Sequence, residues 1–380
     1  MESFNINIQS RNNFWSWIVS CSFYLLSITY SIEPGKSELS EYQSAIDIKH
    51  YYLDLRVDPY KKALSGIAKI KFNLLRDVPY IELDLLNSYH VSGATINGTS
   101  LTFQQEKNKL FIRNQGVHLF KDNIINIKYA GRPPTAKNPP WDGGVTWSKD
   151  NYGRHWVGVS CQINGAHYWY PCKNHPSDKS NGAEILITVP PALMAVSNGL
   201  IQSYETLEDR WVRWHWKTNY PISTYNINFT IGNFQTLEKQ VYIDDSRINM
   251  FYYMIDDNTD RGYALLNQGE EYLRFFSTYF GDYPWSREKL GIVEAPYWGM
   301  EHQTIIAYGN KYKQTDLGYD FILLHEMGHE WWGNYVSVID WSDFWIHEGF
   351  TTYAEAMFVE QKYGIKVMRD QILNSWLRKI

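Results

Sequence analysis

Between residues 46 and 238 the chain repeatedly alternates hydrophobic and polar positions with a period of two. Successive side chains of a strand point to opposite faces of a sheet, so this pattern predicts half-buried strands. Turn signals such as Asn97-Gly98 separate the runs. We expect an all-β domain of antiparallel strands over residues 46–238. The alternating apolar positions are Tyr51, Leu53, Leu55 and Val57; Ala68, Ile70, Phe72 and Leu74; Ile81, Leu83 and Leu85; Val212, Trp214 and Trp216; and Tyr225, Ile227, Phe229 and Ile231.

From residue 239 onward, helical spacing replaces the period of two. Residues 257–279 carry apolar side chains three or four positions apart, which predicts a helix. A second helix is expected around residues 317–332, with Thr315 or Asp316 as its N-terminal cap. A third is expected from about Phe344 to Tyr363, where Gly364 would stop it. Residues 239–380 are therefore expected to form a mixed α/β domain.

The predicted helix around residues 317–332 contains His325-Glu326-Met327-Gly328-His329. Residues four apart lie on one face of a helix, so His325 and His329 can direct their imidazoles at one point. Two histidines in this arrangement are typical of half a tetrahedral zinc site. Glu326 is placed to act as general base toward a water at that site. Glu348, 19 residues after His329, is the candidate third ligand. The alternative is a core helix whose histidines are satisfied by local hydrogen bonds.

Four stretches of this sequence resemble the M1 family of zinc aminopeptidases. Their order and spacing agree with the family over residues 45 to 360. They are HEMGHEWWGN (325–334), WIHEGFTTYAE (345–355), WGMEH (298–302) and CQINGAHYWYPCKNHPSDK (161–179). The resemblance implies a multidomain α+β protein, with an N-terminal antiparallel β saddle or sandwich followed by a thermolysin-like catalytic domain. It also implies one zinc ion (Zn²⁺) per chain and peptide substrates with a free N-terminus.

The resemblance also implies roles for residues outside the zinc motif. Glu301 matches the glutamate that binds the α-amino group of the substrate. Gly299 and Met300 belong to the same substrate-lining motif, and Gln162 matches an amide in the pocket for the first residue. The sequence departs from the family at Trp298 and His302, which replace Gly and Asn, and at Asn164, where many members carry a second amine-binding acid. His347 replaces another Asn, and we interpret it as structural.

The family stabilises the oxyanion of the reaction with a tyrosine well beyond the zinc-binding glutamate. This chain ends 32 residues after Glu348. Tyr353 and Tyr363 are too close in sequence to be obvious substitutes. We therefore expect a catalytic domain that is incomplete at its C-terminus, either in an incomplete gene product or in a fragment. Such a chain is expected to bind zinc but to turn over substrate poorly. Three alternatives to an aminopeptidase remain: a zinc endopeptidase, an epoxide hydrolase, and a non-catalytic peptide- or glycan-binding module.

Composition and the N-terminal residues bear on partners and location. The net charge of −5, without a basic stripe, argues against nucleic acid as a partner. Residues 14–30 form an apolar run after Arg11, so residues 1–31 are expected to be a signal peptide or, alternatively, a membrane anchor, followed by a linker over 32–45. We expect export to the periplasm, cell surface or exterior. Cys161 and Cys172 would then either form a disulfide or remain buried thiols.

Overall fold

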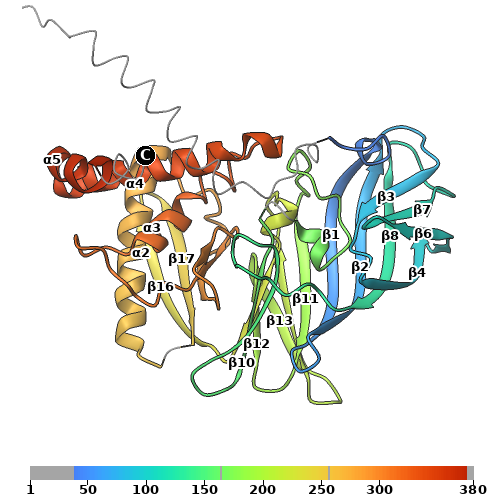
Figure 1. Ribbon diagram of the computed structural model, residues 1–380, viewed down its shortest axis with the longest axis horizontal. Coiled ribbons are helices and arrows are strands. Elements are labelled where there is room, and N and C mark those ends of the chain that lie inside the picture. Colours follow the sequence, from blue (N-terminus) through green and yellow to red (C-terminus); the bar gives the residue numbers. More distant parts are fainter. Residues whose placement is uncertain (1–37, 163–164, 256, 375–380) are drawn as a thin grey trace, which may run out of the picture.

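The computed structural model describes residues 38–162, 165–255 and 257–374 (Figure 1). The predicted signal segment at residues 1–31 and the first part of the linker lie outside these ranges. The later linker residues include a short 3₁₀ helix, η1 (Gln43–Ala45). Within the described ranges, no helix is both long enough and apolar enough to cross a membrane.

The N-terminal part of the chain is built from three sheets. The largest has eight strands in the order β13 (Leu200–Thr206), β14 (Val212–Thr218), β11 (Ala183–Val189), β1 (Ile46–Asp58), β2 (Ala63–Leu74), β8 (Asp122–Gly131), β4 (Tyr89–Ile96) and β5 (Thr99–Ser100). A three-stranded sheet has the order β3 (Tyr80–Asp84), β7 (Lys109–Arg113) and β6 (Phe103–Glu106). A four-stranded sheet has the order β12 (Met194–Ser197), β15 (Phe229–Gly232), β10 (His155–Ser160) and β9 (Gly144–Lys149).

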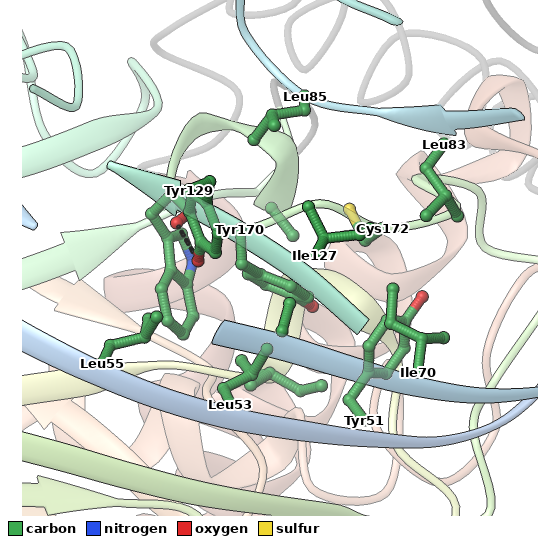
Figure 2. Close-up of a cluster of buried hydrophobic side chains, with 14 of the residues drawn as sticks. Tyr51, Leu53, Leu55, Ile70, Leu83, Leu85, Ile127, Tyr129, Tyr170 and Cys172 are labelled. Carbon is green, nitrogen blue, oxygen red and sulfur yellow. Dashed lines mark hydrogen bonds between the residues drawn. The ribbon is translucent and has the colours of Figure 1, made fainter. Parts of the chain in front are cut away.

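The alternating sequence pattern correctly identifies most of the side chains that form the core of this region, although Val212 and Trp214 of β14 are only partly buried. Tyr51, Leu53, Leu55 and Val57 of β1 are each at most 1% exposed, whereas the residues between them are partly exposed. Burying one such side chain contributes about 1.5–3 kcal/mol. Figure 2 shows several of them packed with Ile127 and Tyr170 between the strands.

Two details of the predicted β domain are wrong. Strand β1 pairs with β11 in parallel, with Tyr51 opposite Ala183, so the largest sheet is mixed rather than purely antiparallel. A tight hairpin would force its two strands to pair antiparallel, whereas the long connection between β1 and β11 allows them to pair in parallel. The expected strand over residues 225–231 is shorter, because Tyr225 lies in the 3₁₀ helix η3 (Thr224–Asn226) and only β15 is extended.

The C-terminal part of the chain has a five-stranded sheet with helices against it (Figure 1). The strand order is β16 (Gln235–Ile243), β17 (Ser246–Met254), β18 (Leu290–Glu294), β20 (Ile305–Tyr308) and β19 (Gly299–Met300). The helices are α2 (Thr259–Phe280), α3 (Phe321–Gly328), α4 (Trp345–Tyr363), the short α5 (Ile365–Val367), a 3₁₀ helix η4 (Trp341–Asp343) and a π-helical turn η5 (Met368–Leu373). Strand β16 runs continuously across the expected domain boundary at 238/239.

Direct contacts hold the four-stranded sheet against the C-terminal part. The Tyr297 hydroxyl donates to the carbonyl of Val159 at 2.7 Å, and the Trp156 indole donates to the carbonyl of Glu294 at 2.9 Å. The buried Lys289 ammonium donates to the carbonyl of Ser197 at 2.9 Å. These contacts fix the end of β10, and the loop that follows it, beside the segment that leads into β19.

The loop after β10 is also anchored in the N-terminal core. It contains the 3₁₀ helix η2 (Ala166–Tyr168) and continues into buried aromatic residues. The Tyr129 hydroxyl donates to the carbonyl of Trp169 at 3.0 Å, and the Tyr170 hydroxyl donates to that of Thr224 at 2.9 Å. Cys161 and Cys172 are both buried and both free thiols. Of the two expectations for this pair, the structure therefore has the unpaired thiols.

Candidate metal centre and active site

Helix α3 carries His325 and Glu326 and has His329 as its C-cap, and it is shorter at both ends than the predicted helix over residues 317–332. Its N-cap is Asp320, whose carboxylate accepts from the amide of Leu323 at 3.1 Å, so the predicted caps Thr315 and Asp316 are wrong. The Tyr308 hydroxyl donates to the same carboxylate at 2.5 Å. The cap is therefore selected by a tertiary contact with β20.

The structure brings His325, His329 and Glu348 together at one point. The two imidazole Nε2 atoms are 3.2 Å apart, and the Glu348 carboxylate lies 3.3 Å from His325 Nε2 and 3.6 Å from His329 Nε2. Neighbouring ligands of a tetrahedral ion with bonds of about 2.0–2.1 Å are about 3.4 Å apart. The three side chains therefore fit a zinc-sized ion without rearrangement. His325 and Glu348 are 18% and 19% exposed, which leaves a side open to water.

Hydrogen bonds on the far side of each imidazole fix its orientation. Nδ1 of His325 donates to Glu355 at 2.6 Å, and Nδ1 of His329 donates to the carbonyl of Trp332 at 2.9 Å. The Thr351 hydroxyl lies 3.2 Å from the same His329 nitrogen. A histidine that donates through Nδ1 presents the lone pair of Nε2, which is the arrangement that metal-binding histidines adopt.

The site concentrates carboxylates in a buried space. Burial raises the pKa of Glu326 well above its usual range, and the charges of Glu301 and Glu348 raise it further. Burial also raises the pKa of Glu301 and that of Glu355. Although burial opposes ionisation of Glu348, the neighbouring histidines hold its pKa at about 2. A bound dication would favour the charged forms of these carboxylates and so offset the effect of burial.

Glu326 points from α3 toward the edge strand of the sheet. A Cβ at Gly299 would collide with its Oε1 atom, so the carboxylate lies directly against the backbone of β19. Met300 is buried in a small cluster with Tyr297 and Phe344. The general-base candidate and the substrate-lining candidates Gly299 and Met300 are thus neighbours, as the sequence motif implies.

Glu301 is 2% exposed and follows β19 directly. Within the described part of the chain, its Oε1 atom has no hydrogen-bond partner. Its backbone carbonyl accepts from the side chain of Asn334 at 2.8 Å, which fixes the turn. Burial raises the pKa of the nearby Tyr225 hydroxyl, and the charge of Glu301 raises it further. A cationic partner would stabilise the charged form of a buried carboxylate with an unused oxygen.

The other predicted residues are placed as follows. Gln162 is half-buried just beyond β10, on the side of the site that the N-terminal sheets supply, and Asn164 lies outside the described residues. His347 is not part of the ligand trio, since its Nε2 accepts from the amide of Val338 at 3.0 Å. Of the two tyrosines near Glu348, Tyr353 is 61% exposed and Tyr363 donates to the carbonyl of Leu317.

Sequence reasoning missed Glu355, Tyr225 and Glu330. Glu355 lies seven residues after Glu348, so the two share a helix face, and this spacing was the available signal. Tyr225 reaches the site from the N-terminal half, where no local pattern marks it. Glu330 is buried and accepts from Trp285, Thr304 and Asn334, which ties the end of α3 to the sheet.

Comparisons with known proteins agree with this architecture. A model of the peptidase M1 N-terminal domain matches residues 48–226, and a model of the peptidase family M1 domain matches residues 263–379. The crystal structure of an M1 zinc metallopeptidase from Deinococcus radiodurans, bound to a Tyr-Ser-Ala substrate, superposes with a TM-score of 0.73. Its sequence identity is 22%, and the match covers 88% of this chain and 75% of that one. The predicted two-domain fold is confirmed.

Several curated relatives are aminopeptidases. Human glutamyl aminopeptidase is 26% identical over 245 residues, which is 60% of this chain and 25% of that protein. Aminopeptidase A of Gloydius brevicauda is 28% identical over 362 residues, covering 85% of this chain and 35% of that one. Leucine aminopeptidase 2 of Candida glabrata is 23% identical over 367 residues, covering 91% and 52%. The matched region thus spans between a quarter and about half of these relatives.

Proposed function

This chain belongs to the M1 peptidase family, and from that premise we propose that it is a zinc-dependent aminopeptidase acting on peptides with a free N-terminus. The observation that carries the proposal is the buried Glu301 carboxylate beside the ligand trio, with one oxygen unpaired among the described residues. A peptide ammonium is the cation that would complete it, through a charge-assisted hydrogen bond.

The proposed ligands for zinc are His325, His329 and Glu348. When bound, zinc would supply Lewis acidity that polarises the first peptide carbonyl and acidifies a water. Glu326 takes the proton of the attacking water and passes it to the leaving amine. Its position against the backbone of Gly299 keeps this carboxylate in one orientation.

The edge of the sheet would hold the substrate. Strand β19 pairs with β20 on one side only, as the last strand of its sheet. An extended peptide can add to such an edge as a further strand. With the amino group at Glu301, the peptide bond that follows the first residue lies nearest to the ligand trio, and Gln162 lines the first pocket.

The test compares a peptide with its N-acetylated form, using zinc-loaded protein and its Glu326→Gln variant. We expect cleavage of the free peptide only, and a loss of roughly 10²–10⁴ in kcat in the variant with its zinc content unchanged. Equal cleavage of both peptides would instead indicate an endopeptidase. Hydrolysis of an epoxide substrate without peptide cleavage would indicate an epoxide hydrolase. Stoichiometric zinc without turnover of any substrate would favour a binding module.

We also propose that the protein is exported. The support is the apolar run at residues 14–30, which stands before the first described residue. Fractionation of the native host followed by N-terminal sequencing tests this. A mature N-terminus near residue 32 in the exported fraction is expected, whereas an intact N-terminus in the membrane fraction would indicate an anchor. Recovery in the cytoplasm alone would contradict both.

A further inference from the structure

Two exposed tryptophans, one from each half of the chain, lie together beside β19. Trp141 is 44% exposed and Trp298 is 46% exposed, and their ring centroids are 6.0 Å apart with an angle of 49° between the planes. Isolated exposed apolar residues are common, but a paired aromatic surface at the edge of a catalytic site indicates a binding function. We call these two side chains the tryptophan pair.

The backbone on both sides of the tryptophan pair is held in place. Trp298 directly precedes Gly299 of β19, its carbonyl accepts from the amide of Gly309 at 2.8 Å, and its indole donates to Asn310 at 3.3 Å. On the other side, the register of β9 and β10 places Gly144 opposite Ser160. Trp141, three residues before Gly144, therefore lies near the end of β10, where Gln162 follows.

The proposed function fixes the direction in which a bound peptide leaves the site. Its amino end is at Glu301, which is 2% exposed, so the rest of the peptide must run outward. The exposed residue that directly precedes β19 is Trp298, three residues from Glu301. An extended peptide advances about 3.3 Å per residue, as a strand does, so about three of its residues run alongside the segment from Glu301 to Trp298. The side chain that meets the tryptophan pair belongs to the third residue of the substrate.

We propose that the tryptophan pair is a specificity subsite that binds an aromatic side chain at the third residue of the peptide. This inference rests on the proposed function and names the substrate class: peptides of at least three residues with Phe, Tyr or Trp in third position. Tilted and edge-to-face contacts between aromatic rings favour such a side chain over an aliphatic one of similar size. The family motif has Gly at the position of Trp298, so this half of the pair is a feature of the present chain.

The experiment measures binding rather than turnover, in zinc-loaded protein carrying Glu326→Gln. Calorimetry compares Leu-Ala-Ala-Ala with peptides in which Phe replaces the second, third or fourth residue. We expect Phe to tighten binding roughly three- to tenfold at the third position, and less at the others. Adding Trp298→Ala or Trp141→Ala should abolish this gain, while Trp298→Phe should retain part of it. Tyr204→Ala removes an exposed aromatic residue stacked on Trp214 elsewhere and is the matched control.

The outcomes separate this inference from the proposed function. A gain that is largest at another position, or that survives both alanine variants, would overturn the subsite. Measurable binding with equal affinities for all four peptides would do the same and leave the aminopeptidase proposal intact. A third-position preference in a protein that cleaves none of these peptides with Glu326 restored would support the subsite and contradict the proposed activity.

Discussion

Glu355 accepts a hydrogen bond from Nδ1 of His325 at 2.6 Å, while the other nitrogen of the same ring points at His329 and Glu348. Glu355 itself is 3% exposed and lies two turns along α4 from Glu348. One helix therefore supplies both a proposed ligand and the group that orients another ligand.

We expect Glu355→Gln to weaken zinc binding about 10- to 100-fold, because the amide holds the imidazole less firmly and lowers its basicity. Competition with a chromophoric chelator measures this affinity directly. Glu360→Gln, an exposed change on the same helix, is the control and should leave the affinity unchanged. Equal affinities in the Glu355 variant and the original protein would show that this hydrogen bond does not support the metal.

His329→Ala should reduce zinc affinity by more than the roughly 10- to 100-fold expected for loss of an outer hydrogen bond. His347 is the matched comparison, because it is equally buried and lies next to Glu348 but accepts a hydrogen bond from Val338. Elemental analysis after dialysis should find zinc in His347→Asn and little in His329→Ala. The reverse result would exchange the roles of the two histidines.

His302 should make the protein sensitive to acid. Burial lowers its pKa to about 3, whereas the unfolded chain binds this proton below about 6.5. The unfolded state therefore holds more protons between these values, and stability falls as the pH drops from 6.5 toward 3. At pH 5 the loss is roughly 2 kcal/mol.

His302→Asn removes this titration, so the change in unfolding free energy between pH 7 and pH 5 should shrink by about 2 kcal/mol. Urea unfolding in the presence of a chelator measures it without a contribution from metal release. His90→Asn, at an exposed position of β4, controls for the loss of a histidine. An unchanged pH dependence in the His302 variant would mean that this ring gains a proton freely in the folded state.

Asn334 joins the two halves of the molecule. Its amide donates to the carbonyl of Glu301 at 2.8 Å and to Glu330 at 3.0 Å, and its oxygen accepts from Asn226 at 2.9 Å. Asn334→Ala removes one hydrogen bond from each of these three buried groups and should cost roughly 2 kcal/mol. Urea denaturation measures this loss, with Asn151→Ala in an exposed turn as the control. A loss no larger than that of the control would show that water replaces the amide.

The metal-binding residues were predictable because their geometry is largely local. A spacing of four residues at the end of α3 brings His325 and the C-cap residue His329 together, and Gly364 marks the end of the helix that carries Glu348. The start of α3 was not predictable, since Asp320 accepts a hydrogen bond from Tyr308 of β20, which lies 12 residues earlier in the sequence. The parallel pairing of β1 with β11 was hidden for a similar reason, because alternation gives the face of each residue but not the partner of each strand.

Tyr225 shows the limit of periodicity more sharply. Its spacing from Ile227 and Phe229 is that of a strand, yet it lies in a 3₁₀ helix. Its ring contacts Trp341 and Phe344, both from the C-terminal half, at centroid distances of 5.7 Å and 6.4 Å. Packing between the halves thus sets the local conformation there.

The three proposed metal ligands lie in one half, at the C-terminal end of α3 and on α4, whereas Trp141, which contacts Trp298, comes from the other half. Amino-acid changes in the N-terminal half can therefore alter the surface around the tryptophan pair while the distances within the ligand trio stay fixed. In proteins that share this architecture, the side-chain preference of the proposed subsite can therefore change while the metal-binding residues stay the same.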